Sequence, residues 1–259
     1  MKKVRGPART LLLGIAACVV FAGLGTAGAP GGADPADDGI HDPWQGFNRK
    51  IFWFNEKFDQ YLFEPFAKGW DFVLPDMAQQ GISNVFENLS FPINFANNLL
   101  QAKPVAALEH VGLFLLNSTL GMGGLIDAGA RVGLHPTDED FGQTLGYWGV
   151  PAGPYLVLPF LGPSNPRDAV GRGVDGATRI YPFFAPFWVN TTANIVDLSN
   201  TRAELLDEIS ESRERAFDYY AFVRNAFVSY RENQITDSAD PAPEEAEEKG
   251  DDLYYFEEE

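Results

Sequence analysis

The sequence predicts an all-α protein that enters an apolar environment without crossing it. Apolar side chains recur at helical spacing near both ends of the folded part, and prolines fall where short helices would begin. One long stretch is too apolar for a water-exposed surface and too interrupted to span a membrane. With 259 residues, 45% of them hydrophobic, the chain is long enough to bury a sizeable core in one domain.

The long apolar stretch runs from Val111 to Gly129 and reads VGLFLLNSTLGMGGLIDAG. Its one charged residue is Asp127. A spanning helix needs about 20 predominantly apolar residues, whereas the polar residues Asn117 to Thr119 and the glycine-rich LGMGG interrupt this run. We therefore interpret it as backbone that enters an apolar environment and does not cross it.

The amino-acid composition limits the kinds of partner that the chain can bind. The chain has 21 Phe, 5 Trp and 9 Tyr, more than an ordinary soluble core requires, and Tyr and Trp favour membrane–water boundaries. The formal net charge is -17, and residues 237–259 carry eleven carboxylates against one lysine. No cluster of Lys and Arg follows the basic N-terminus. This argues against nucleic acid as a partner and against docking to anionic lipid head groups by charge.

The N-terminus has the layout of an export signal, with basic residues before a short apolar stretch. Residues 1–17 are predicted to be this signal peptide. Ile15 to Cys18 has the form of a bacterial lipobox, so Cys18, the only cysteine in the chain, is the candidate lipidation site. The alternative is cleavage by ordinary signal peptidase after Ala29. Pro30 disfavours that cut, whereas the apolar Val19 to Phe21 is unusual for the start of a mature lipoprotein.

Two segments without apolar periodicity flank the folded part. Residues 18–42 are rich in Gly, Ala, Pro and Asp and are predicted to be a flexible tether. Residues 236–259 are acidic and low in complexity, and we expect a disordered tail. The helical domain is therefore predicted to span residues 43–235.

The first helix of this domain has a wide apolar face. Phe47, Ile51, Phe54, Phe58 and Tyr61 recur at steps of four, three, four and three, which is the spacing of one helical face. Two interpretations remain open. The segment is either a core-facing amphipathic helix or a helix that lies in a membrane interface.

Prolines and asparagines mark the next region. Pro75, Pro92 and Pro104 each stand where a helix of roughly 8 to 15 residues would begin. Five asparagines either satisfy backbone and turns or line a polar path: Asn84, Asn88, Asn94, Asn97 and Asn98. His110, within a helix, and His135, in a polar turn, are interpreted as ordinary structural residues.

The second half alternates Gly, Pro and aromatic residues. Residues 141–163 are predicted to be a loop covered by lipid or protein, with Tyr155 to Leu158 as a possible short strand.

Two further helices are predicted after this loop. Asn165 to Asp168 is expected to begin a helix, with Asp168 in its first turn. Thr201 to Glu204 is interpreted as a capping box that opens the last long helix. The apolar face of that helix would be formed by Ile209, Ala216, Tyr220, Val223, Phe227 and Tyr230.

Five ordered blocks carry a family resemblance: DPWQGFNRKIFWFN, NLSFPINFANNLLQ, LNSTLGMGGLIDAG, FGQTLGYWGVPAGPYLVLPFLGPSNPRDAVG and RAELLD. In this order they resemble the MlaA (VacJ) family of outer-membrane lipoproteins. The resemblance covers about Asp42 to Gln234. It implies a single ring- or disc-shaped domain of short amphipathic helices, embedded in the inner leaflet of the outer membrane at its periplasmic face and anchored by lipid.

The resemblance also implies a function and partners. Family members contact trimeric porins and take mislocalised phospholipids from the outer leaflet through a central amphipathic channel. A soluble periplasmic carrier resembling MlaC then receives the lipid, and outer-membrane lipid asymmetry is maintained. No cofactor and no metal is expected. A polar groove inside a ring of apolar helices would let a head group pass while the tails stay in the bilayer.

On this interpretation the lipid path includes five residues of the long apolar stretch: Asn117, Gly121, Met122, Gly123 and Gly124. LGMGG would be a turn or flexible element beside the path. The alternative is that its glycines simply allow close helix packing.

Enzymatic activity is not expected, and no catalytic residue is proposed. The sequence has no G-x-S-x-G and no H-E-x-x-H motif, and its three histidines are scattered. Arg167 and Asp168 could form a catalytic pair, but an ion pair at a helix start explains them better. A phospholipase is therefore the weaker alternative. A structural porin-associated lipoprotein without transport fits the composition equally well.

Overall fold

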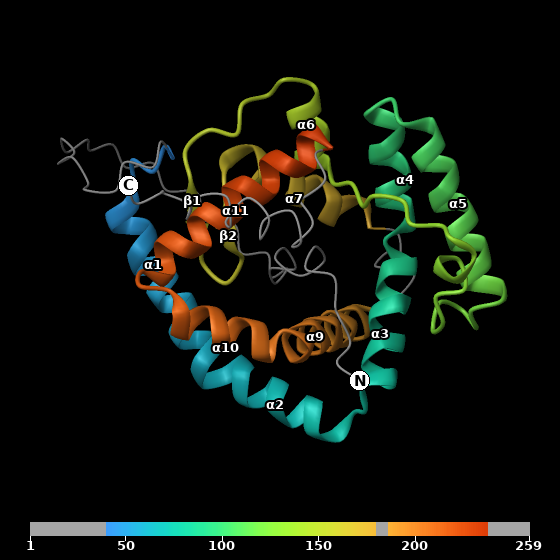
Figure 1. Ribbon diagram of the computed structural model, residues 1–259, viewed down its shortest axis with the longest axis horizontal. Helices are drawn as coiled ribbons and strands as arrows, with labels where there is room; N and C mark the ends of the chain where they lie inside the picture. The colour runs from blue at the N-terminus through green and yellow to red at the C-terminus, as the bar shows by residue number, and fades with distance from the viewer. Residues whose placement is uncertain (1–39, 180–185, 238–259) are drawn as a thin grey trace, which may run out of the picture.

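The computed structural model describes residues 40–179 and 186–237 (Figure 1). The predicted signal peptide with Cys18, the predicted tether as far as residue 39 and the predicted tail from residue 238 lie outside the described residues. The division of the chain into these segments therefore stays a prediction.

The described residues are mostly α-helical, which confirms the predicted fold class. In chain order the elements are α1 (Gln45–Phe58), a π-helical turn (Asp59–Phe63), α2 (Glu64–Val73), α3 (Asp76–Leu89), α4 (Phe91–Leu100), α5 (Pro104–Thr119), a 3-10 turn (Ala130–Val132), α6 (Phe141–Tyr147), β1 (Leu156–Leu158), β2 (Gly162–Ser164), α7 (Pro166–Thr178), α9 (Phe187–Glu204), α10 (Leu206–Arg215) and α11 (Tyr219–Thr236).

The helices are arranged around a ring when viewed down the shortest axis of the molecule (Figure 1). In this view α1 lies at the left, α2 and α10 below, α3 to α5 at the right, and α6, α7 and α11 above. α9 lies on the inner side of α2, whereas α5 lies on the outer side of α4. This arrangement is consistent with the ring or disc that the family resemblance implies.

The predicted helix starts at the prolines are confirmed. Pro75 is the N-cap of α3, Pro92 is the second residue of α4, and Pro104 is the first residue of α5. Proline suits these positions because its missing amide hydrogen has no partner in the first turn of a helix and its φ is already helical.

α1 is joined to the hairpin of β1 and β2 by a buried asparagine. The two strands are antiparallel, with Leu156 opposite Ser164. Asn48 of α1 is fully buried. Its Oδ1 accepts a hydrogen bond from the Val157 amide (3.0 Å), and its Nδ2 donates to the Tyr155 carbonyl oxygen (3.0 Å) and to Asp42 (2.8 Å).

A second asparagine of α1 holds the tip of the same hairpin. Asn55 accepts from the Phe160 amide (2.8 Å) and donates to the Leu158 carbonyl oxygen (2.9 Å). Phe160 has a left-handed backbone with φ of 62°, which is unfavourable for a residue with a side chain. Its ring packs edge-on against Phe54 and Phe58, at centroid distances of 5.2 and 5.0 Å. These contacts fix the tip against α1.

The apolar face predicted for the first helix contributes to the core only in part. Phe47 is 56% exposed and Tyr61 is 79% exposed, whereas the buried residue of α1 is the polar Asn48. Moreover, the helical turn at Asp59–Phe63 is π-helical, so the spacing of 3.6 residues does not continue to Tyr61. The core-facing interpretation is therefore wrong for Phe47 and Tyr61, for which the membrane-interface alternative remains, whereas Ile51 of the same face packs against the core.

The predicted capping box is also wrong. Thr201 to Glu204 forms the last turn of α9, where the Glu204 carboxylate accepts from Ser83 (2.9 Å). α9 continues to this point because it packs against α2 and α3 through the buried Asn200 and Ala203. The predicted long helix is divided at Ala216 into α10 and α11, and the N-cap of α11 is Asp218.

The predicted loop at 141–163 contains more regular structure than expected. Its first seven residues form α6, whose N-cap is Asp140 with its side chain accepting from the Gln143 amide. The possible strand at Tyr155 to Leu158 is present as β1, and its partner β2 was not predicted. The predicted helix start at Asn165 is confirmed, because Asn165 caps α7 by accepting from the Asp168 amide (2.8 Å).

The small apolar core lies between α1, the hairpin and α11. It consists of Tyr155, Val157, Tyr220 and Phe227, with Ile51, Phe52 and Val228 packed against it. Across the described ranges, no helix combines the length and the apolar character needed to cross a bilayer.

We expect Asn48→Ala to lower the free energy of unfolding by about 2 to 4 kcal/mol, because it leaves the buried Val157 amide and Tyr155 carbonyl without their partner. Denaturant unfolding of the full chain in detergent measures this. Lys50→Ala, at an exposed position of the same helix, is the control and should change the value by less than about 0.5 kcal/mol. Equal effects of the two substitutions would show that the asparagine bridge contributes nothing.

Candidate functional site: a polar interior and an apolar surface

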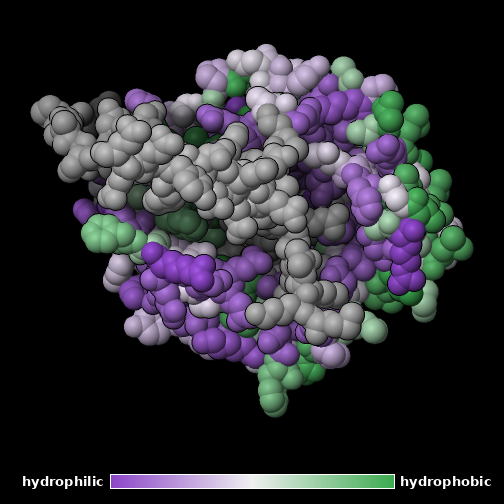
Figure 2. Space-filling view, in the orientation of Figure 1, coloured by the Kyte–Doolittle hydropathy of each residue, from purple (hydrophilic) through white to green (hydrophobic). Residues whose placement is uncertain are grey.

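The polarity of the described residues is inverted relative to a water-soluble protein. Polar and charged side chains outnumber hydrophobic ones among the buried residues by three to one. Large apolar side chains are exposed instead, among them Phe72 at 91% and Met77 at 87%. Figure 2 shows hydrophobic residues gathered along the right-hand rim, over α4 and α5, beside a largely hydrophilic face. Such a surface favours an apolar surrounding.

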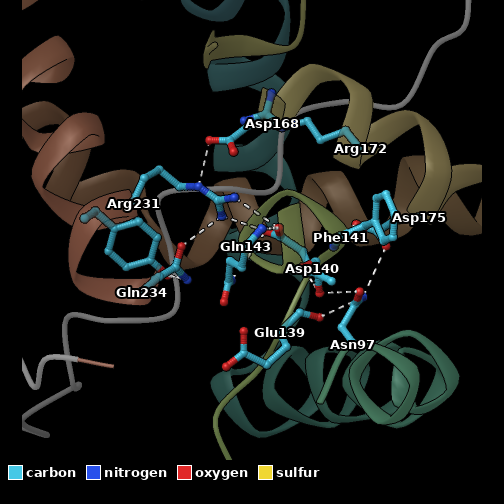
Figure 3. A network of polar contacts seen from close by, with 12 residues as sticks. Asn97, Glu139, Asp140, Phe141, Gln143, Asp168, Arg172, Asp175, Arg231 and Gln234 are labelled. Atoms are coloured by element: carbon cyan, nitrogen blue, oxygen red, sulfur yellow. Dashed lines mark hydrogen bonds and ion pairs between the residues drawn. The ribbon is translucent and has the colours of Figure 1, made fainter. Parts of the chain in front are cut away.

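The interior is organised by one guanidinium, that of Arg231 on α11, which is 4% exposed. Its Nε donates to Asp168 (2.8 Å), and its Nη1 and Nη2 donate to the two carboxylate oxygens of Asp140 (2.6 and 3.0 Å) (Figure 3). Asp140 caps α6, and Asp168 lies in the first turn of α7. One cation therefore joins three helices, and both carboxylates also meet the positive end of a helix dipole.

The pKa shifts in this cluster follow from burial and pairing. Burial alone would raise the pKa of Asp140, but the hydrogen bonds and charge of Arg231 outweigh it and hold the pKa below its usual value. Burial likewise disfavours the charged form of Arg231, yet Asp140 and Asp168 raise its pKa. Both partners are thus ionised across the physiological range.

A second layer of contacts connects α4 to α6 and α7. Asn97 of α4 accepts from the Thr144 hydroxyl (2.9 Å) and donates toward Asp175 of α7 (3.4 Å). Asp175 also accepts from the Phe141 amide (3.0 Å). Burial raises the pKa of Asp175 to about 6. Because this pKa is raised on folding, the carboxyl contributes stability below about pH 4, and the contribution is lost as the pH rises through about 6.

Glu139 forms the contact between α5, α4 and the segment before α6. Its side chain is fully buried and accepts from Gln101 (2.8 Å) and from Lys103 (2.8 Å). Burial raises its pKa, although both donors oppose the shift. Like the Arg231 cluster, this contact satisfies a charge that water does not reach.

Of the five residues predicted for the lipid path, Asn117 lies in the last turn of α5, and Gly121 to Gly124 lie in the turn that follows. Asn117 is buried, and its side chain accepts from the Gly129 amide (2.9 Å) and donates to Asp127 (3.2 Å). The prediction of a turn at LGMGG is confirmed. Figure 1 places α5 and this turn on the outer side of the ring.

The glycines of this turn differ in their surroundings. A Cβ on Gly121 would lie 2.1 Å from the Ile126 carbonyl oxygen, and one on Gly124 would lie 3.0 Å from Asn88. Gly123 has open space, and the neighbouring Met122 is exposed. Close packing thus explains Gly121 and Gly124, whereas the membership of all five residues in a lipid path stays a prediction.

The remaining candidate residues have structural roles. Arg167 donates to Asp168 (3.0 Å) at the start of α7, as the ion-pair interpretation predicted. His110 is buried, with Nε2 3.0 Å from the Thr137 carbonyl oxygen.

Within residues 40–179 and 186–237, no three His, Cys, Asp or Glu side chains are grouped so as to hold a metal ion. A cavity lined by His110, Asn88 and Asp138 has a volume of about 20 Å³, room for one water molecule.

The Arg231 cluster was missed from the sequence, although two signals were present. Asp140 precedes Gln143 by three residues, the spacing of a helix cap. On α11, Tyr220, Arg224, Phe227 and Arg231 recur at steps of four, three and four and are all buried. Two arginines on a buried helical face indicate buried carboxylate partners.

Polar interior, apolar surface and short helices together define a class: a membrane-associated helical protein. Residues 40–234 match the family model of the MlaA lipoprotein. The chain therefore belongs to the MlaA lipoprotein family.

Relatives of known name support this assignment. The intermembrane phospholipid transport system lipoprotein MlaA of Escherichia coli strain K12 is 36% identical over 232 residues, covering 86% of this chain and 90% of the relative. The Haemophilus influenzae protein of the same name is 34% identical over 204 residues, 76% and 80% of the two chains. A structure solved in work on the structural basis for maintenance of bacterial outer membrane lipid asymmetry aligns with a TM-score of 0.66 at 35% identity, covering 75% of this chain and 98% of that one.

Replacing the buried Arg231 should destabilise the fold. We expect Arg231→Met to lower the free energy of unfolding by about 3 to 5 kcal/mol, because Asp140 and Asp168 would remain buried without their partner. The matched control is Arg215→Met, which removes an exposed pair with Glu211 and should cost less than about 1 kcal/mol. Denaturant unfolding in detergent compares them, and similar losses would contradict the role given to Arg231.

The turn after α5 should tolerate no side chain at Gly121. We expect Gly121→Ala to cost roughly 2 to 3 kcal/mol, since its Cβ would overlap two backbone carbonyl oxygens. Gly46→Ala in α1, where nothing lies within 4 Å, should cost nothing or stabilise by up to about 1 kcal/mol. Thermal unfolding of both variants provides the measurement. A tolerated Gly121→Ala would rule out the close-packing explanation.

Proposed function

We propose that this protein removes mislocalised phospholipids from the outer leaflet of the outer membrane and passes them to a soluble periplasmic carrier, so that lipid asymmetry is maintained. The observation that carries the proposal is the inverted polarity of a chain that belongs to the MlaA lipoprotein family. Relatives covered over most of their length bear the name of an intermembrane phospholipid transport system.

The physical reason is the cost of moving a head group through hydrocarbon. An unpaired polar group costs several kcal/mol there, and a charged one costs more. Hydrogen-bonding side chains on the inner side of a ring would replace water around the head group, while the exposed apolar side chains outside contact acyl chains. No covalent step is needed, so we infer transport without catalysis.

Location and partners are part of the proposal. We infer that the ring lies in the inner leaflet of the outer membrane at its periplasmic face, with Cys18 as the lipid anchor and a trimeric porin beside it. The exposed Met122 and Gly123, after α5, would then contact lipid at the outer rim. The carrier that receives the lipid would resemble MlaC.

The inner side of α9 offers a position at which to test passage. Ala193 is a small, half-buried residue of this helix, three residues after Asn190 and four before Asp197, so all three share one face. We expect Ala193→Trp to obstruct a path along that face. Ala177→Trp, at an exposed position of α7, is the matched control.

The experiment deletes the gene in the source bacterium and restores it with wild type or either variant. Deletion should raise phospholipid in the outer leaflet and increase outer-membrane permeability, and wild type and Ala177→Trp should reverse both. Ala193→Trp should fail to do so although it is produced, folded and membrane-bound. An unchanged outer leaflet after deletion would contradict the transport function.

Two alternatives predict other outcomes. A purely structural porin-associated lipoprotein would restore the barrier with Ala193→Trp as well as with wild type. A phospholipase would release fatty acid or lysolipid from phospholipid vesicles when the purified protein is added, and we expect no such release.

A further inference from the structure

The inner helix α9 carries a polar stripe along one face. Asn190, Asn194, Asp197, Thr201 and Glu204 recur at steps of four, three, four and three, and all five are half-buried. The neighbouring face packs against α2 and α3 through Asn200, which bonds Trp70 and Ser83. Large apolar residues of α9, such as Phe187 and Trp188, are exposed instead. Half-buried polar groups therefore follow one face of α9, which lies on the inner side of α2 (Figure 1).

Asp197 differs from the acids that pair with Arg231, Asn97 and Lys103. Asp140, Asp168, Asp175 and Glu139 each accept hydrogen bonds at distances of 3.0 Å or less. For Asp197, by contrast, the described part of the chain supplies neither a hydrogen bond nor an ion pair within 4 Å. A carboxylate that is half-buried and unmatched in this way is costly unless a ligand supplies the partner.

The electrostatic surroundings indicate which ligand fits. Burial raises the pKa of the Asp197 carboxyl to about 6, and the nearby charges are the attractive Arg179 and the repulsive Glu204. Arg179 is the C-cap of α7, and its charge also acts on Asp175 of that helix. A cation beside a carboxylate matches a ligand with separate negative and positive groups.

Resting on the transport function proposed above, we propose that Asp197 receives the ammonium group of a zwitterionic phospholipid, with Arg179 beside its phosphate. A primary ammonium has three hydrogen-bond donors and no acceptor, which suits a carboxylate that lacks donors. An anionic head group without an ammonium would meet repulsion from Asp197 and Glu204 at the same place. Asp197 is thus a specificity-determining residue for the lipid head group.

The test measures which lipids the full-length protein takes up. Protein in detergent micelles is incubated with vesicles of equimolar phosphatidylethanolamine and phosphatidylglycerol, re-isolated, and its bound lipids are quantified by mass spectrometry. Wild type should enrich phosphatidylethanolamine, and Asp197→Asn should lower the bound ratio by about tenfold, the size of one charge-assisted hydrogen bond, without lowering total lipid. Asp197→Glu should retain most of the preference.

The control is Asp207→Asn, which removes an equal charge at an exposed position in the first turn of α10 and should leave the ratio as in wild type. Thermal unfolding confirms that each variant is folded. An unchanged ratio in Asp197→Asn, or a wild type without preference, overturns the inference while leaving transport intact. A wild type that takes up neither lipid overturns the proposed function, and the inference with it.

Discussion

The ion pairs of Arg231 with Asp140 and Asp168 are the interaction on which the rest of the structure depends. α6, α7 and α11 meet at this guanidinium, and α4 reaches the same place through Asn97. In an apolar surrounding the hydrophobic effect gives helices little reason to associate, so hydrogen bonds and close packing must hold them. The small apolar core around Tyr155 and Phe227 fits this account, because polar contacts replace the core that a soluble domain of this length would have.

The sequence predicted secondary structure correctly where a single residue determines it locally. Proline fixes a helix start whatever surrounds it, so Pro75, Pro92 and Pro104 were placed correctly. The capping motif at Thr201 was misleading, because packing of α9 on α2 and α3 overrides a local preference worth about 1 kcal/mol. The face predicted from Phe47 to Tyr61 is core-facing only at Ile51, since apolar periodicity shows which residues share a side and does not show whether that side meets protein or lipid.

The candidate site was harder to predict than the fold. LGMGG was recognised as a turn, but whether Gly121 or Gly123 is enclosed depends on the position of Ile126 and Asn88, which no local pattern gives. Arg231 and Asp140 are 91 residues apart, and their pairing follows from the way three helices meet. Asp197 has no hydrogen-bond or ion-pair partner among the described residues. This can be recognised only from the three-dimensional positions of the residues around it.

The asparagines of α1 have a further consequence for the hairpin. A two-stranded sheet exposes unpaired amide and carbonyl groups along its edges, and such an edge is a template for strand addition by another chain. Asn48 takes the outward amide of Val157 in β1, and Asn55 bonds the Leu158 carbonyl oxygen and the Phe160 amide at the hairpin tip, so side chains of α1 close this edge. The hairpin is thereby protected at this edge from strand addition by other copies of the chain.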